Sequence, residues 1–203
     1  GIKDKPTKKI TVSATDTLRK HYRTLLLLSG YLGSRSLMKG GLMGFLPVYL
    51  TERGVSIWTA GISLVVLQFA GALGTLAAGP ISDILGRRKV LFIVALVSPF
   101  LLLGFANASD MFVIMTLLFV TGFFLFAPMP VMLARVNEIR TDHPSFINGI
   151  YMALNFITTA VAVLLVGFLG DRFGLNKTYQ IAAYLAFGAI PIALMIQNKK
   201  SGT

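Results

Sequence analysis

The stretch Gly79-Pro-Ile-Ser-Asp83-Ile-Leu-Gly86-Arg-Arg-Lys89 is a short polar and basic segment between two long apolar runs. A second stretch, Gly167-Phe-Leu-Gly-Asp171-Arg-Phe-Gly174-Leu-Asn-Lys177, begins 88 residues further along the chain. Each has a glycine, an aspartate four positions later, a second glycine three positions after that, and a lysine three positions further on. The match indicates an internal repeat, which is the feature to identify before a fold is assigned.

Six apolar runs surround these stretches, and each is long enough to cross a bilayer. About 20 apolar residues suffice for a helical crossing, and a segment in lipid must satisfy its own backbone hydrogen bonds. Apolar residues make up 55% of the chain and charged residues 13%, and the mean hydropathy is +0.74. We therefore predict an all-α membrane protein and exclude a water-soluble one. The expected spans are residues 24–50, 57–82, 90–108, 111–134, 146–169 and 178–197.

The basic residues are distributed unevenly between the two sides of the predicted bundle. The net charge of +11 would by itself suit a nucleic-acid-binding protein. However, six spans put both termini on one side, which carries 14 of the 19 lysines and arginines, against three on the other. The positive-inside rule places that side in the cytoplasm, so we expect a multi-pass protein of the cell (inner) membrane that attracts anionic lipids, and no nucleic acid. The domains are then a basic cytoplasmic leader or linker at 1–21, a transmembrane domain at 22–198 and a cytoplasmic tail at 199–203.

The two repeated stretches lie on opposite sides of the membrane in this topology. Gly79–Lys89 follows the second span on the cytoplasmic side, whereas Gly167–Lys177 follows the fifth span on the outer side. Helices one to three and four to six would therefore be copies of opposite orientation. Such a 3+3 inverted repeat forms half of some secondary transporters.

The segment Gly79–Leu91 resembles the cytoplasmic signature between the second and third helices in each half of the major facilitator superfamily. A complete member has twelve helices, so the resemblance implies one half, with a second six-helix half as its partner. The fourth span has no early arginine and the leader is basic, which is similar to a C-terminal half and the linker before it. Arg35-Ser36, Phe45–Leu50 and the break at Ala127-Pro-Met-Pro130 are similar to the fosmidomycin-resistance branch of efflux pumps. The family resemblance also implies coupling to protons, although the usual membrane carboxylates are not in this chain.

The cytoplasmic stretch has the residues of a gating latch. Gly79 allows two backbones to approach closely, and Gly86 closes a turn after Asp83, whose carboxylate can accept hydrogen bonds from helix N–H groups, Arg87 or Arg88. A charge cluster at a helix interface can form in one state and break in another. The resemblance implies the same role, a latch that favours the outward-facing state. The alternative is a plain polar turn with arginines that face lipid.

Two cations, Arg35 and Lys39, lie near the middle of the first apolar run and on one helix face. A charge inside a membrane costs roughly 2.5 to 3.5 kcal/mol on insertion scales, so a partner is expected. No acid lies within the six spans, which leaves two explanations, an anionic substrate or a carboxylate from another half or protomer. We predict that the substrate-binding residues are Arg35, Lys39, Tyr31, Gln68 and Asn155; the alternative for the two amides is a hydrogen bond between helices.

Motifs of other function classes are absent from the sequence. There is no Walker-type loop, no metal-ligand spacing and no catalytic Ser/His/Asp grouping, and the chain has no cysteine. We therefore expect no enzyme, cofactor or metal, but a half-transporter unit that moves a small anionic or zwitterionic solute or drug by alternating access. Two alternatives are a homodimeric half-transporter, in which Arg35 meets its own mate across the two-fold axis, and a membrane scaffold or receptor that retains the fold.

Overall fold

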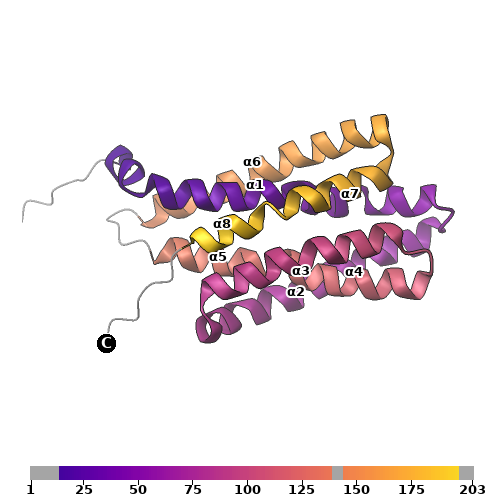
Figure 1. Cartoon of the computed structure of the whole chain (residues 1–203), viewed down its shortest axis with the longest axis horizontal. Helices are drawn as coiled ribbons and strands as arrows, with labels where there is room; N and C mark the ends of the chain where they lie inside the picture. Colours follow the sequence, from indigo (N-terminus) through magenta and orange to yellow (C-terminus); the bar gives the residue numbers. More distant parts are fainter. Residues whose placement is uncertain (1–13, 139–143, 197–203) are drawn as a thin grey trace, which may run out of the picture.

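The computed structural model describes residues 14–138 and 144–196, and nearly all of this part of the chain is helical (Figure 1). Its helices run back and forth along the long axis of the molecule. Within the described residues they are α1 (Ala14–Glu52), α2 (Ile57–Leu85), α3 (Arg87–Asn107), α4 (Met111–Phe126), α5 (Pro128–Asn137), α6 (Pro144–Phe173), α7 (Leu175–Ala186) and α8 (Ala189–Met195).

Five segments of the described chain are long and apolar enough to cross a membrane. They are α2, α3, the pair α4 and α5, α6, and the pair α7 and α8. Helix α1 has 39 residues, more than enough for a crossing, but it is not among these five because its apolar run is interrupted by polar and charged residues such as Arg35 and Lys39. The prediction of an all-helical, multi-pass membrane fold is therefore confirmed. Five segments of the described chain, rather than six, are long and apolar enough to cross a membrane.

The helices begin and end at residues with recognisable capping chemistry. The hydroxyl of Ser56 accepts a hydrogen bond from the N–H of Thr59 at 3.2 Å, and the carboxylate of Asp110 accepts one from the N–H of Val113 at 3.0 Å. Gly86 and Gly174 each separate two helices without an intervening loop, with φ of 89° and 83°, a backbone conformation that favours glycine. These two glycines are equivalent positions of the repeat in the sequence.

Two buried apolar clusters fill the interior, one toward each end of the bundle. One contains Leu46, Phe105 and Tyr179, and the other contains Leu28, Leu91 and Met132. Helix α2 packs along α4, and α1 packs along α6 and α7. The α2–α4 contact is so close that a Cβ at Gly74 would collide with the backbone carbonyl of Phe123, so glycine acts here as the small-residue seam of membrane helices.

A polar network joins the helix ends at the opposite end of α3 from the turn at Gly86. Tyr49 is only 2% exposed and donates to the carbonyl of Ala106 at 3.2 Å. The guanidinium of Arg53 donates to the Tyr49 oxygen at 3.0 Å and to the carbonyl of Ala108 at 2.6 Å. This end of α1 is therefore fixed to the turn between α3 and α4.

Most observed helix boundaries lie within a few residues of the expected spans, and three differences are larger. Helix α1 already begins at Ala14, inside the expected leader, while residues 1–13 and 197–203 lie outside the described part. The fourth span breaks at Ala127, as its prolines suggested. The sixth span also breaks, at Phe187 and Gly188, where Pro191 has no N–H to donate to the carbonyl of Phe187, four residues earlier.

Candidate functional site

Arg35 is buried in the middle of the bundle, with 6% of its surface exposed. Its Nη2 donates to the hydroxyl of Ser98 on α3 at 2.9 Å and to the backbone carbonyl of Phe124 on α4 at 3.3 Å. Its guanidinium also lies over the ring of Tyr31, 5.6 Å from the ring centre, where the electron-rich face attracts a cation. Its Nε has no hydrogen-bond partner. Arg35 is therefore held by neutral groups, and no carboxylate of the described residues pairs with it.

Lys39 lies one turn further along α1 and turns toward a different helix. Its ammonium group is 3.5 Å from the side-chain oxygen of Asn155 on α6, which is a long and weak hydrogen bond. The two like charges thus diverge, Arg35 toward α3 and α4 and Lys39 toward α6. This separation lowers their repulsion and leaves a gap between the helices.

The gap is a cavity that four of the predicted binding residues line. It measures about 50 Å³, well below the roughly 300–1,000 Å³ of small-molecule pockets, so a larger ligand needs the surrounding helices to move apart. Gln68 is exposed on α2 and does not line the cavity. The lining consists of Tyr31, Leu32, Arg35, Ser36, Lys39, Leu125, Phe126, Pro128, Met129, Tyr151, Asn155, Thr158 and Thr159.

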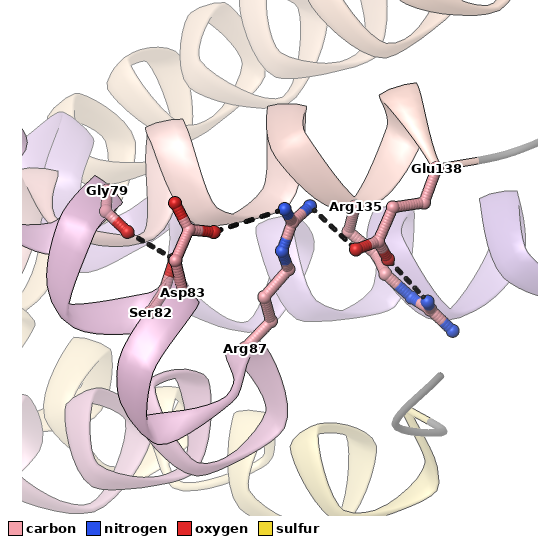
Figure 2. Close-up of polar contacts among 6 residues, drawn as sticks. All are labelled: Gly79, Ser82, Asp83, Arg87, Arg135 and Glu138. Carbon is pink, nitrogen blue, oxygen red and sulfur yellow. Dashed lines mark hydrogen bonds and ion pairs between the residues drawn. The ribbon is translucent and has the colours of Figure 1, made fainter. Parts of the chain in front are cut away.

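The latch stretch forms an ion-pair chain that reaches another helix end (Figure 2). Arg87 is 3.3 Å from the carboxylate of Asp83 and 3.3 Å from that of Glu138, which follows α5. Glu138 also accepts from Arg135 of α5 at 2.8 Å. The start of α3 is therefore tied both to the end of α2 and to the end of α5.

Two of the predicted latch residues take no part in the ion-pair chain. Arg88 forms no ion pair within the described residues. A Cβ at Gly79 would meet nothing within 4 Å, so Gly79 is not a close-packing site in this part of the chain. Its carbonyl instead accepts a hydrogen bond from the hydroxyl of Ser82 at 2.8 Å (Figure 2).

Several residues of the two sites were missed in the sequence. Arg135 and Glu138 have the spacing of a helix-surface ion pair, which is a usable signal, but their contact with Arg87 depends on the packing of α5. Tyr151 and Ser98 carry polar groups inside apolar runs, yet nothing in the sequence shows that they face Arg35 or the cavity. No group of three or more metal-ligating side chains occurs in the described part.

Comparison with known proteins relates the fold to transporters. The Escherichia coli (strain K12) fosmidomycin resistance protein is 26% identical over 155 residues, which are 75% of this chain and 37% of that protein. An uncharacterised protein of Archaeoglobus fulgidus is 30% identical over 164 residues, 77% of this chain and 75% of that one. The crystal structure of the E. coli fucose:proton symporter FucP matches with a TM-score of 0.74 at 17% identity, over 92% of this chain and 46% of that one.

The chain thus spans less than half the length of the fosmidomycin resistance protein and of FucP. The expected similarity to the fosmidomycin-resistance branch is confirmed. A family model described as Major Facilitator Superfamily matches residues 27–202, most of the chain. These matches agree with the sequence signature at Gly79–Leu91 and the multi-pass helical fold, and the chain belongs to the Major Facilitator Superfamily.

Proposed function

We propose that this chain is one half of a secondary active transporter that binds a small anionic or zwitterionic solute or drug at the membrane midplane. The observation that carries the proposal is Arg35, a buried cation that lines a cavity and has no acidic partner among the described residues. A buried charge is strongly unfavourable unless it is paired. A ligand anion beside Arg35 and Lys39 would supply that pairing, with Tyr31 and Asn155 of the same cavity as further binding residues.

The proposed scaffold is a six-span bundle with a 3+3 inverted repeat, in which α1 is the first span. The packing supports it. When spans one to three are exchanged with spans four to six, each contact between two spans has a counterpart. The first span packs on the fifth as the fourth packs on the second, and the first packs on the sixth as the fourth packs on the third. The shared turn geometry of Gly86 and Gly174 is further support.

The ion-pair chain of Asp83, Arg87, Glu138 and Arg135 is the proposed latch. It connects three helix ends at the side that we assign to the cytoplasm. Breaking it would free α5 to move relative to α2 and α3, which is the kind of two-state contact that alternating access needs. Gly79, Gly86 and Arg88 complete the stretch. Proton coupling is part of the proposal, and the name of the FucP symporter supports it only by analogy.

The proposed partner is a second six-helix half, with this chain in the place of the C-terminal half. The long relatives support an N-terminal partner, since the chain matches only part of each. The A. fulgidus relative supports the alternative of two copies, because the chain covers 75% of it. In either case we propose a cell (inner) membrane, both termini in the cytoplasm, and anionic lipids as neighbours.

The test is oxyanion binding by the purified protein in lipid nanodiscs, with its mass measured in parallel. We expect sulfate and short organic oxyanions to raise the thermal unfolding temperature, and Arg35→Met to abolish this rise. Counterflow of a stabilising anion in proteoliposomes, with and without a pH gradient, then tests transport and coupling. If no oxyanion stabilises the protein, the anion site is wrong; if binding occurs at a mass of one chain without counterflow, transport requires the second half.

A further inference from the structure

The cavity between α1, α4, α5 and α6 is lined by a few polar groups and by apolar side chains, and this composition bears on its ligand. We infer that the ligand is an amphipathic organic anion, with one oxyanion head bound by Arg35, Lys39 and the hydroxyl of Tyr151, and an apolar body against residues 125–129. The inference rests on the anion site of the proposed function and adds to it the chemistry of the rest of the ligand.

Tyr151 supplies the third donor for the head group. It lies on α6, is 1% exposed and lines the cavity, and its hydroxyl has no hydrogen-bond partner. The Nε of Arg35, a residue that lines the same cavity, also has no hydrogen-bond partner. A buried donor without an acceptor is unfavourable, and both of these atoms are screened from solvent in this state. An oxyanion that reaches these two atoms would accept a hydrogen bond from each of them.

The remaining hydroxyl groups of the lining do not offer donors to a ligand. Ser36 donates to the carbonyl of Gly33 at 2.8 Å, Thr158 donates to that of Leu154 at 2.7 Å, and Thr159 donates to that of Asn155 at 2.8 Å. Each hydroxyl proton is therefore used within its own helix. Few donors of the lining are therefore free, and a polyhydroxylated or polyanionic ligand would leave most of its oxygens without a donor. A ligand with a single anionic group and an otherwise apolar surface fits this lining better.

The rest of the cavity lining is apolar. The apolar lining residues are Leu125, Phe126, Pro128 and Met129, together with Leu32 on the same helix face as Arg35 and Lys39. Met129 is 42% exposed and its flexible thioether can adapt to bodies of different shape. Burial of a ligand methylene against such a lining is favourable in proportion to the area removed from water.

The test uses alkyl sulfonates, which stay ionised throughout the working pH range, and measures their dissociation constants with the full chain in nanodiscs. From methanesulfonate to hexanesulfonate, we expect affinity to rise about two- to fourfold per methylene. Inorganic sulfate should bind more weakly than hexanesulfonate, and hexyltrimethylammonium, with the same chain and the opposite charge, should not bind.

Two pairs of variants separate the head from the body. Tyr151→Phe should weaken every sulfonate about tenfold without lowering thermal stability, because its hydroxyl has no partner in the empty protein. Tyr179→Phe is its control: that hydroxyl donates to the carbonyl of Gly41 at 3.0 Å outside the cavity, so stability should fall and affinity should not. Met129→Gln should flatten the dependence on chain length, whereas Met152→Gln, 41% exposed but outside the cavity, should not.

Three results would overturn the inference. These are sulfate that binds as tightly as hexanesulfonate, equal binding of the hexyl cation, and a Tyr151→Phe variant with unchanged affinity. If anions bind in an Arg35-dependent manner but without chain-length dependence, the proposed function stands and the amphipathic ligand fails. If no anion binds at all, both fail together.

Discussion

Ser98 is the side chain that holds Arg35 in place. Its hydroxyl accepts from Arg35 at 2.9 Å and donates to the carbonyl of Val94 at 2.6 Å. Because a hydrogen bond to a charged group contributes about 1.5–3 kcal/mol, we expect Ser98→Ala to lower the free energy of unfolding by about 1–3 kcal/mol. Reversible unfolding in mixed micelles measures this.

A matched serine and a double-mutant cycle make that prediction specific. Ser82 is equally buried but bonds only within its own helix, to Gly79, so Ser82→Ala should cost less than Ser98→Ala. In an Arg35→Met background the cost of Ser98→Ala should fall below about 1 kcal/mol, because the charged donor is gone. An unchanged cost in that background would mean that Ser98 acts through packing alone.

At the residue scale, the sequence could identify which cations matter but not where they point. The absence of acids from the spans singled out Arg35 and Lys39, because unpaired charge in lipid requires an explanation. Their divergence depends on the approach of α3, α4 and α6, which local spacing does not encode. For the same reason Asn155 could not be separated from Gln68, although only Asn155 lines the cavity.

The contact of α2 with α4 requires glycine at position 74. A Cβ there would collide with the backbone carbonyl of Phe123, which cannot move without a shift of the helix. We expect Gly74→Ala to destabilise the protein by about 3 kcal/mol or more, comparable to other overpacking changes. Gly61→Ala on the same helix meets nothing within 4 Å and should be neutral or stabilising by up to about 1 kcal/mol. Equal unfolding midpoints for the two variants would contradict this packing.

Glu138 is the centre of the proposed latch at the element scale. Its side chain is 25% exposed and pairs with both Arg87 and Arg135, whereas that of Asp83 is 67% exposed and pairs with Arg87 alone. We therefore expect Glu138→Gln to cost about 1–2 kcal/mol of stability and Asp83→Asn less than about 0.5 kcal/mol. The difference should shrink in 1 M salt, where the Debye length is about 3 Å. If Asp83→Asn costs more, the latch is centred on α2 instead.

At this scale the sequence could predict the helices and the break in the fourth span, but not which helices contact one another. Apolar length fixed the helices, since lipid allows few other structures, and Pro128 and Pro130 indicated the break between α4 and α5. Pro191 stands in the same relation to the break at Gly188 between α7 and α8, although a proline in a membrane helix does not always interrupt it. The contact between Arg87 and Glu138 joins residues far apart in the chain, so only the folded bundle reveals it.

For the whole molecule, two global patterns of the sequence were informative. Gly86 and Gly174, which hold the same position in the stretches Gly79–Lys89 and Gly167–Lys177, have similar positive φ values of 89° and 83°. The turns at these glycines lie at opposite ends of the bundle (Figure 1). Hydropathy was less reliable for α1, because the same cations that mark the candidate site lower the apolar character of its helix.

The orientation of the bundle in the membrane can be tested with single cysteines, because the chain contains none. Ser109 lies in the turn between α3 and α4, and Ile84 is 84% exposed near the turn between α2 and α3 at the other end. Neither substitution changes the charge balance that sets the topology. We expect a membrane-impermeant maleimide to label Ser109→Cys in intact cells and Ile84→Cys only after permeabilisation. Labelling of Ile84→Cys alone in intact cells would place the latch outside and reverse the proposed gating, because the ion-pair chain would then close the outer end.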